Sequence, residues 1–351
     1  MPRALDNYDG LLNWDNFQAW LETQGDVPGK GPVTDVEKLT GGSQNNLFLM
    51  TRGGEKFVLR RPPKHLRGNS NDTMLREARV LKALAGSDVP HPDFYAVCAD
   101  TDVIGVCFYL MKPLEGYSPS RELQGEYATN PAWRKAMGEE MIKATSALAR
   151  VDYAKVGLAD FGKADDWHNR QVARWRSQLE GYRELPGYEG SNLPHVDEVG
   201  AWLSANVPKD GRIGILHGDH QFPNIMFSLK APKVSGLIDW ELSTLGDPML
   251  DLGWVLTSWY EPGDPKDPMV QPWDNFISRS DLIRLYGEHT GRDMSNVGWF
   301  FVLACYKLGC ILEGSYARAK AGQASMDIGQ RLHDYAIYLF TKGKSLIDAA
   351  G

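Results

Sequence analysis

Three oxygen-bearing side chains, Asp219, Asn224 and Asp239, stand in an order suited to phosphoryl transfer. Asp219 ends the motif His-Gly-Asp, Asn224 follows on the same short loop, and Asp239 comes directly after an apolar run at 234–238. Phosphoryl transfer needs a carboxylate that positions the attacking hydroxyl, and oxygen ligands that hold Mg²⁺ against nucleotide phosphates. We therefore predict Asp219 as the catalytic carboxylate and the other two side chains as metal ligands.

Each part of this motif has a plainer interpretation. An aspartate at the end of a strand usually caps a turn or a helix, and a lone His-Gly-Asp is common in unrelated proteins. The ordered set of three, each preceded by a predicted strand, is much harder to obtain by accident. The set favours chemistry over capping.

A nucleotide-binding side is predicted upstream of these residues. The loop 40–45 (Thr-Gly-Gly-Ser-Gln-Asn) lies between two predicted strands, where Gly42 allows backbone N–H groups to approach phosphates and Ser43 adds a hydroxyl. Arg60 ends a later strand, and Glu77 follows on a predicted helix. We predict that Arg60 holds the nucleotide phosphates while Glu77 orients its guanidinium. The alternatives are that the loop 40–45 is only a turn and that Arg60 and Glu77 are only surface charges.

Composition is typical of a soluble globular enzyme. The 351 residues are 42% hydrophobic and 24% charged, and the net charge of -7 argues against a nucleic-acid partner. We find no apolar run near the length of a membrane span and no signal peptide at the start, so we expect no membrane contact and a cytoplasmic location. The four cysteines form no Cys-x-x-Cys pair and are expected to be buried thiols.

The order of predicted elements divides the chain into two regions. Residues 11–25 have helical spacing. The region 33–114 is mainly strands, with a hairpin around Gly53 and Gly54 and further strands at 94–98 and 103–111. One helix, from Asp72 or Thr73 to Leu84, interrupts these strands. After residue 116 the pattern is mostly helical, with short strands at 212–216, 225–227 and 234–238. We predict a cleft between a small sheet lobe and a larger helical lobe.

Taken together, these motifs resemble the aminoglycoside phosphotransferase family, and especially the kinase domains joined to acyl-CoA dehydrogenases. The resemblance covers residues 33–320, with motifs at 39–43, 57–63, 76–81, 217–224 and 238–252. It implies an α+β, protein-kinase-like fold with two lobes: a five-stranded antiparallel sheet plus one helix, then a mainly helical lobe. The predicted units are a helical extension (1–32), a nucleotide-binding lobe (33–114) and a catalytic, acceptor-binding lobe (115–351).

The same resemblance implies an ATP- and Mg²⁺-dependent kinase of a small-molecule hydroxyl. Residues 108–116 would form the interlobe hinge, where the carbonyl of Lys112 and the N–H of Leu114 meet the adenine edge. Most kinases carry lysine where this chain has Arg60, whose bulkier fork alters the contacts with the nucleotide. The path from Asp239 to Asp251 is too short for a long phosphorylatable activation segment, as in small-molecule kinases.

Five further residues near the motifs are given supporting roles or left open. His217 is expected to be a scaffold that bonds to backbone near Asp239, rather than a general base. Asp247 and Asp251 are expected to cap a helix that opens at Pro248 and to brace the catalytic loop. Glu241 either contacts the metal through water or caps its loop. His220 either faces the acceptor or is solvated.

The acceptor is expected to bind in the helical lobe, after Asp251 and within residues 165–190. Between Glu261 and Lys320 the chain has eight acidic and seven basic residues, a balance that does not suit a polycationic aminoglycoside. Three functions stay open: a kinase of a hydroxyacyl-CoA or apolar alcohol, an antibiotic kinase, and a nucleotide-binding module without turnover. The expected partners are a small-molecule acceptor and, for the oligomeric state, a second copy of the chain.

Overall fold

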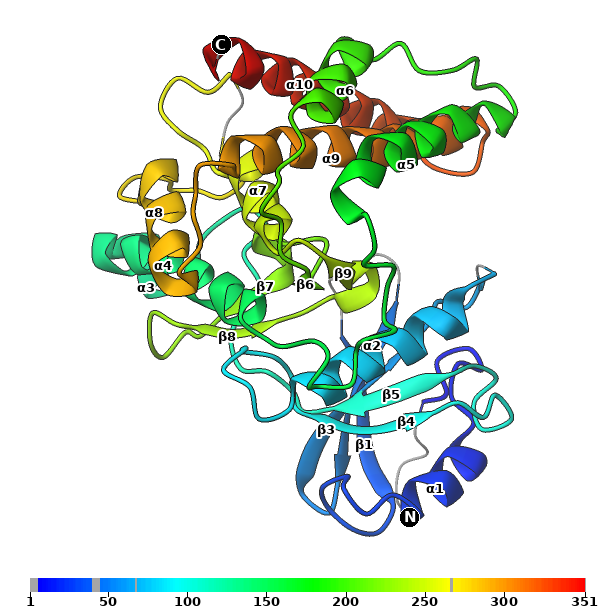
Figure 1. Cartoon of the computed structure of the whole chain (residues 1–351). Helices are drawn as coiled ribbons and strands as arrows, with labels where there is room; N and C mark the ends of the chain where they lie inside the picture. The colour runs from blue at the N-terminus through cyan, green and yellow to red at the C-terminus, as the bar shows by residue number, and fades with distance from the viewer. Residues whose placement is uncertain (1–5, 40–44, 67, 266–267, 351) are drawn as a thin grey trace.

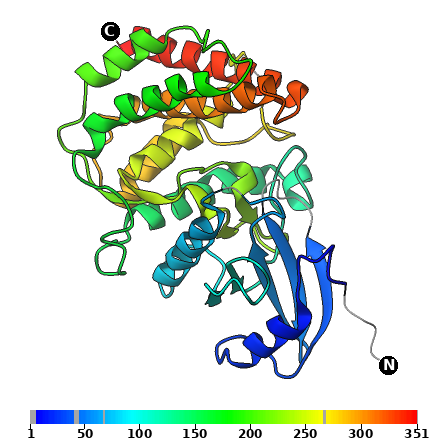
Figure 2. The same cartoon turned by 90° about the vertical axis from the view of Figure 1, so that its right-hand side faces the viewer.

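The computed structural model describes residues 6–39, 45–66, 68–265 and 268–350. A sheet-rich part at one end adjoins a larger, mainly helical part (Figures 1 and 2). Gly42 and Ser43, the predicted phosphate-loop residues, lie outside the described residues. The two-lobed α+β fold expected from the sequence is confirmed, whereas the exact domain boundaries stay a prediction.

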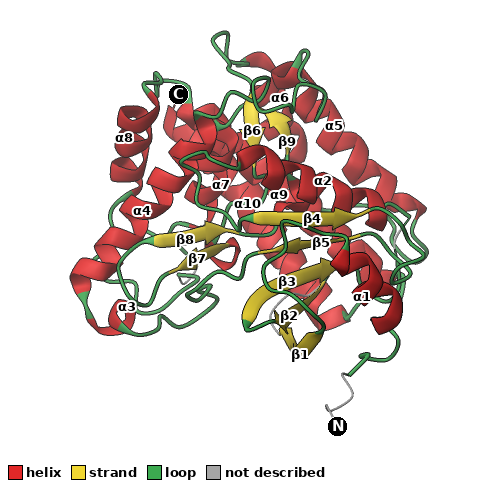
Figure 3. Ribbon diagram, turned by 90° about the horizontal axis from the view of Figure 1, so that it is seen from below, coloured by secondary structure: helices red, strands yellow, loops and turns green. Residues whose placement is uncertain are grey.

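The sheet of the first part is antiparallel and five-stranded, in the order β1-β2-β3-β5-β4 (Figure 3). Its strands are β1 (Val33–Leu39), β2 (Asn46–Arg52), β3 (Glu55–Arg61), β4 (Phe94–Cys98) and β5 (Phe108–Met111). Gly53 and Gly54 both have positive φ, at 56° and 85°, as a two-residue hairpin turn requires. The predicted hairpin is therefore confirmed.

Two helices flank this sheet. Helix α1 (Trp14–Glu22) packs on one face, where Phe17 contacts Phe108 of β5, and α2 (Ser70–Leu84) packs near β4 and β5 on the side that faces the helical part. Helix α2 begins two to three residues before the predicted cap, because Asn69 precedes its first turn. The sheet part thus presents α2, and the residues on it, to the rest of the chain.

The predicted strand at 103–111 is wrong over its first half. Residues 103–107 form turns, with Gly105 at a φ of 84° and its N–H donating to the Thr101 carbonyl, and β5 starts only at Phe108. Val103, Ile104 and Val106 are buried against the α1 side of the sheet. Their apolar character reflects this burial rather than strand pairing.

The second part is built from helices around two small strand pairs. Its helices are α3 (Glu126–Thr129), α4 (Pro131–Ala149), α5 (Trp167–Gly181), α6 (Val196–Ala205), α7 (Met249–Ser258), α8 (Arg279–Thr290), α9 (Val297–Lys320) and α10 (Met326–Ala350), with single turns η1 (Tyr182–Glu184), η2 (Phe222–Asn224) and η3 (Trp240–Leu242). The strand pairs are β7 (Ile225–Phe227) with β8 (Val234–Leu237), and β6 (Gly214–Leu216) with β9 (Thr244–Gly246). The sequence prediction missed β9.

Helix α9 lies inside the helical part. It is long and apolar enough to span a membrane by length and composition, with a mean hydropathy of 1.4 in its most apolar window, so the expectation that no such run exists was wrong. However, 72% of that window is buried within the protein, where α9 packs against α7 and α10. This is the pattern of a core helix, which brings its side chains to the back of the loop that follows β6.

Candidate active site

The loop that carries Asp219 leaves β6 through a turn that only glycine fits. Gly218 has a φ of +87°, and a Cβ at this position would lie 2.3 Å from the carbonyl oxygen of Leu242. The loop and the segment after Asp239 therefore touch backbone to backbone. This close approach sets the Asp219 loop against the turn that follows Asp239.

Amide groups fix the Asp219 carboxylate. Asn224 Nδ2 donates to Asp219 Oδ2 at 2.7 Å and to the Asp219 backbone carbonyl at 2.9 Å, and Gln221 Nε2 donates to Oδ1 at 2.8 Å. Asn224 is buried, whereas Asp219 is half-buried. Because the amide nitrogen of Asn224 is spent on Asp219, its Oδ1 remains the atom that can ligate a cation.

Two buried side chains brace the same loop from below. Asp251, on α7, accepts the backbone N–H groups of His217 at 2.7 Å and Gly218 at 3.0 Å. Lys307, on α9, donates from Nζ to the Gly218 carbonyl at 3.1 Å. Burial raises the pKa of Asp251 and lowers the pKa of Lys307 to about 8. The loop is thus held from both its N–H and its carbonyl side.

Backbone contacts place Asp239 next to this loop. His217 Nε2 bonds to the Ile238 carbonyl at 2.9 Å, and the Ile238 N–H donates to the Asn224 carbonyl at 2.9 Å. Pairing of β7 with β8 continues the same contact along the chain. His217 therefore makes the backbone contact expected of a scaffold, and Asp239 leaves β8 in the left-handed region, with a φ of 67°.

Arg60 connects the sheet part to Asp239. Its Nε lies 2.8 Å from Glu77 Oε2, its Nη2 donates to Glu77 Oε1 at 3.2 Å, and Nη2 also lies 2.7 Å from Asp239 Oδ1. Tyr109, opposite Arg60 on β5, donates from its hydroxyl to Glu77 Oε2 at 3.0 Å. Glu77 and Arg60 are both buried. The predicted pair is present, and it reaches across to the Asp239 loop.

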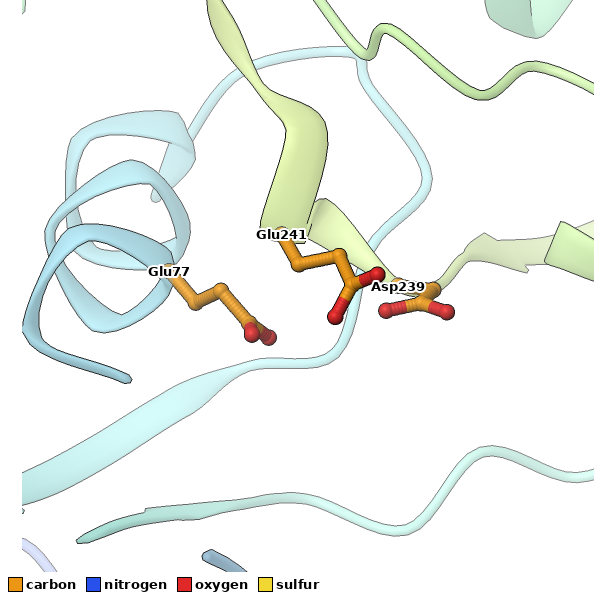
Figure 4. Close-up of side chains that lie close together, drawn as sticks. All are labelled: Glu77, Asp239 and Glu241. Atoms are coloured by element: carbon orange, nitrogen blue, oxygen red, sulfur yellow. The ribbon is translucent and has the colours of Figure 1, made fainter. Parts of the chain in front are cut away.

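Three carboxylates gather around the Arg60 guanidinium. Glu77 comes from α2, and Asp239 and Glu241 come from the turn after β8; one carboxylate oxygen from each of the three lies within 4.8 Å of the other two (Figure 4). Burial, followed by the charges of Asp239 and Glu77, raises the pKa of Glu241 to about 7. Three acids against one guanidinium leave excess negative charge, which a divalent cation can neutralise.

The donor set fits a hard cation. Carboxylate and amide oxygens are the ligands that Mg²⁺ prefers, and here Asn224 Oδ1 and Asp239 Oδ2 are available beside the cluster. Arg60 donates to Asp239 Oδ1, so its guanidinium bonds directly to the carboxylate that the sequence predicts as a metal ligand. The roles of these residues stay predictions.

Asp247 has a structural position outside the cluster. Its carboxylate accepts the Met249 N–H at the start of α7 and the Arg212 N–H, both at 3.0 Å. It also forms a two-pronged pair with Arg292 and bonds to His168 Nε2 at 3.0 Å. These contacts keep its pKa low although burial opposes ionisation. Asp247 therefore fastens α7 to the segments on either side.

The hinge residues lie where the chain passes from β5 to the helical part. The Lys112 side chain is exposed and pairs with the Asp93 carboxylate. The backbone N–H of Lys112 donates to the backbone carbonyl of Asp93 at 2.8 Å. Leu114 is half-buried, and its Cδ1 would lie 2.4 Å from a Cβ at Gly236 of β8. Leu114 thus covers the strand that leads to Asp239. The adenine contacts of both residues stay predictions.

His220 is neither solvated nor available to an acceptor. It is fully buried, and its Nε2 bonds to Thr145 Oγ1 at 2.8 Å. The Thr145 hydroxyl donates to the Met141 carbonyl, so the imidazole is the donor in the bond between them. Burial, with the charge of His217, holds the pKa of His220 well below its usual value. A buried neutral histidine replaces both alternatives drawn from the sequence.

Sequence reasoning missed three side chains that contact this site. Tyr109, Gln221 and Lys307 bond to Glu77, Asp219 and the Gly218 carbonyl, as described above. Gln221 could have been found from its place two residues after Asp219. Lys307 left one signal, because it is a lone cation within the apolar run of α9.

Comparison with known proteins assigns the family. The profile of the phosphotransferase enzyme family (APH) matches residues 35–269, about two thirds of the chain. This chain belongs to that family. Acyl-CoA dehydrogenase family member 10 of Mus musculus is 30% identical over 312 residues, which are 86% of this chain and 28% of that protein. The chain thus spans less than a third of this relative.

Solved structures of the family share the fold. A crystal structure of a putative aminoglycoside phosphotransferase from Ralstonia eutropha has a TM-score of 0.78 and 30% identity, covering 95% of this chain and 98% of that one. A thermostable mutant of the phosphotransferase APH(4)-Ia, in ternary complex with AMP-PNP and hygromycin B, has a TM-score of 0.59 and 13% identity, covering 89% and 95%. The second likeness shows the fold alone. The chain therefore has the kinase-like fold of the phosphotransferase family to which it belongs.

Proposed function

We propose that this phosphotransferase is an ATP- and Mg²⁺-dependent kinase that phosphorylates a hydroxyl group of a small molecule, a hydroxyacyl-CoA or another largely apolar alcohol. The observation that carries the proposal is the Asp219 carboxylate. Two amide donors hold it, and it lies next to a carboxylate cluster that contains Asp239. Family membership and an AMP-PNP complex of a structural neighbour support a nucleotide donor.

The chain's own residues orient the reacting groups. Asn224 and Gln221 each donate one hydrogen bond to the Asp219 carboxylate, which fixes its plane and leaves a lone pair on each oxygen. One lone pair accepts the acceptor hydroxyl proton and turns the hydroxyl oxygen toward the phosphoryl group. Asp251 and Lys307 hold the Asp219 loop in place, because Asp251 accepts the Gly218 N–H and Lys307 donates to the Gly218 carbonyl.

Nucleotide and metal would be held beside the Asp219 loop, between Asn224 and the Arg60 guanidinium. Asn224 and Asp239 supply metal ligands, and Arg60, oriented by Glu77, contacts phosphate oxygens. Mg²⁺ when bound neutralises charge on the transferring phosphoryl group. Glu241 stands close enough to the cluster to join through water. The hinge around Lys112 and Leu114 would meet the adenine.

The nature of the acceptor separates the leading proposal from an antibiotic kinase. The neighbour in complex with hygromycin B and a macrolide 2'-phosphotransferase are only 13% and 15% identical to this chain. The curated relative named above is an acyl-CoA dehydrogenase family member, and the balanced charge of residues 261–320 does not suit a polycation. These observations favour a hydroxyacyl-CoA or apolar alcohol.

The decisive experiment compares the wild type with Asp219→Asn. ADP release and a mass gain of one phosphoryl group are followed for 4-hydroxydecanoyl-CoA, a long-chain alcohol and kanamycin. We expect the substitution to lower kcat by about 10² to 10⁴ while AMP-PNP binding persists. Asp210→Asn, an exposed aspartate before β6, is the matched control. ADP release at the buffer background in both wild type and D219N, with AMP-PNP still bound, would leave only a nucleotide-binding module without turnover. Equal ADP release above background in both proteins would overturn the catalytic role of Asp219.

The cellular setting follows from the same proposal. We propose a cytoplasmic enzyme whose partners are its small-molecule acceptor and, in a homodimer, a second copy of the chain. Neither a nucleic acid nor a membrane is proposed as a partner, in keeping with the net charge of -7. Sedimentation and cell fractionation test these points separately from the kinase assay.

A further inference from the structure

A recess opens between α5 and α9, on the helical side of the Asp219 loop. The two helices lie side by side in Figures 1 and 2 and contact each other. Side chains from α5, α7, α9, β6, β9 and η3 line the recess, among them Arg174, Trp175, Leu242, Thr244 and Lys307. The recess thus combines aromatic and apolar walls with two cations.

One tryptophan ring organises both cations. Arg174 Cζ lies 4.9 Å from the centre of the Trp175 ring, and Lys307 Nζ lies 5.4 Å from the same ring. The ring is fixed because Trp175 Nε1 donates to Gln171 Oε1, whose side-chain amide donates to the Trp167 carbonyl. Both cations therefore lie against a ring that hydrogen bonds hold in place. Arg174 is exposed to solvent, and Lys307 Nζ also lies 4.4 Å from the centre of the Trp254 ring.

The charges in the recess are incompletely balanced. Lys307 is buried at 6% exposure, and the charges of Asp251 and Asp219 act on it, as does the repulsive charge of Arg174. Arg174 has no carboxylate partner among the residues that the structure describes, whereas its neighbour Arg176 pairs with Glu180 and Asp197. One guanidinium is left to bind an anion.

The recess adjoins the predicted chemistry. Leu242 follows directly after Glu241 of the carboxylate cluster, Thr244 comes two residues later, and Leu242 is 41% exposed. Lys307 reaches the backbone of Gly218, one residue before Asp219. A molecule in this recess would therefore lie close to Asp219, on the helical side where the acceptor is expected.

We propose that Arg174 and Lys307 recognise an anionic group, a carboxylate or a phosphate, on the hydroxyl acceptor, while Trp175, Leu242 and Leu216 contact its apolar part. This inference rests on the proposed kinase function and narrows its substrate class. A guanidinium binds both oxyanions through paired hydrogen bonds. The same two cations repel a polycationic aminoglycoside, so the recess selects against the alternative acceptor.

The test uses three probes on the full chain: 4-hydroxydecanoate, its CoA thioester and its neutral N-acetylcysteamine thioester. Binding is measured by calorimetry and by Trp fluorescence, and turnover by phosphoryl mass gain. We expect an anionic probe to bind the wild type about tenfold more tightly than the neutral one, and Arg174→Gln to remove that preference by raising Kd and KM about tenfold with little change in kcat. Arg176→Gln is the matched control, and we expect it to match the wild type.

The outcomes separate this inference from the proposed function. Preference for the carboxylate or for the CoA thioester identifies which anion the recess holds. Equal binding of neutral and anionic probes, or an unchanged Kd in R174Q, overturns the inference even if phosphoryl transfer proceeds. The converse result is selective anion binding that Arg174→Gln abolishes, while no phosphoryl group is transferred to any probe or alcohol. That result supports anion binding in the recess and refutes the kinase proposal.

Discussion

Replacing Arg60 with methionine is expected to destabilise the fold through Glu77. The Glu77 side chain is 1% exposed and the Arg60 side chain 9%, and two contacts of 2.8 and 3.2 Å join them. Methionine fills the volume but leaves the carboxylate buried with one hydrogen bond, from Tyr109. Removing one partner of a buried ion pair lowers the free energy of unfolding by about 3–5 kcal/mol. The substitution also removes the contact of Arg60 with Asp239.

The loss should depend on pH in a defined direction. Burial raises the pKa of Glu77 even with Arg60 in place, and without Arg60 it rises further. A carboxyl with a higher pKa in the folded than in the unfolded state stabilises the fold at low pH, and this stability is lost as pH rises above about 4.3 toward the folded pKa. R60M should therefore be more destabilised, relative to the wild type, at pH 8 than at pH 5.5.

A double-mutant cycle measures the pair itself. Urea unfolding followed by Trp fluorescence is compared for wild type, Arg60→Met, Glu77→Gln and the double variant at both pH values. Because the glutamine carries no charge, we expect the double variant to regain about 2 kcal/mol or more relative to additive losses. Additive losses, or a penalty in R60M below about 1 kcal/mol that does not change with pH, would refute the reasoning.

Three further substitutions probe the scaffold around the site. Asp247→Ala removes the counter-ion of Arg292 and the α7 cap, and should lower the free energy of unfolding by about 3–5 kcal/mol in urea titrations; a loss under about 1 kcal/mol would contradict a supporting role. Gly218→Ala should lower the free energy of unfolding by about 1–3 kcal/mol through backbone strain alone. The clash of the new Cβ with Leu242 should lower it further and should also lower kcat. Gly105 also has a positive φ but has open space around it, so Gly105→Ala should show only the loss from strain. Because His220 is held neutral in the folded state, the free energy of unfolding should fall as pH falls below about 6.5, where the unfolded state gains a proton. His220→Gln should make the free energy of unfolding less dependent on pH. An equal pH dependence in both proteins would contradict a role of His220 in it.

Much of the fold could be predicted because its signals are local. Turn glycines at 53 and 54 specify the hairpin, and the spacing of apolar residues on α2 specifies a helix. The run at 103–107 was misassigned because apolar residues signal burial without saying what they pair with. β9 was missed because a three-residue strand carries too little pattern to detect without its partner β6.

The candidate site was predictable in its composition and only partly in its contacts. Asp219, Asn224 and Asp239 were found because few other functions require these residue types in this order. Their functional roles stay predictions. The pairing of Arg60 with Glu77 could be inferred, but its extension to Asp239 could not, because that contact spans 179 positions along the chain.

The sequence by itself determined the family, the order of the two lobes and the residue types that face the cleft, since these depend on local pattern and on side-chain chemistry. Only the tertiary structure decided which groups meet: Lys307 under the Gly218 carbonyl, His220 buried on Thr145, and Arg174 beside Lys307 on one tryptophan ring. Such contacts arise when α5, α9 and the loops pack around a shared core. Packing depends on the whole chain, and no short segment encodes it.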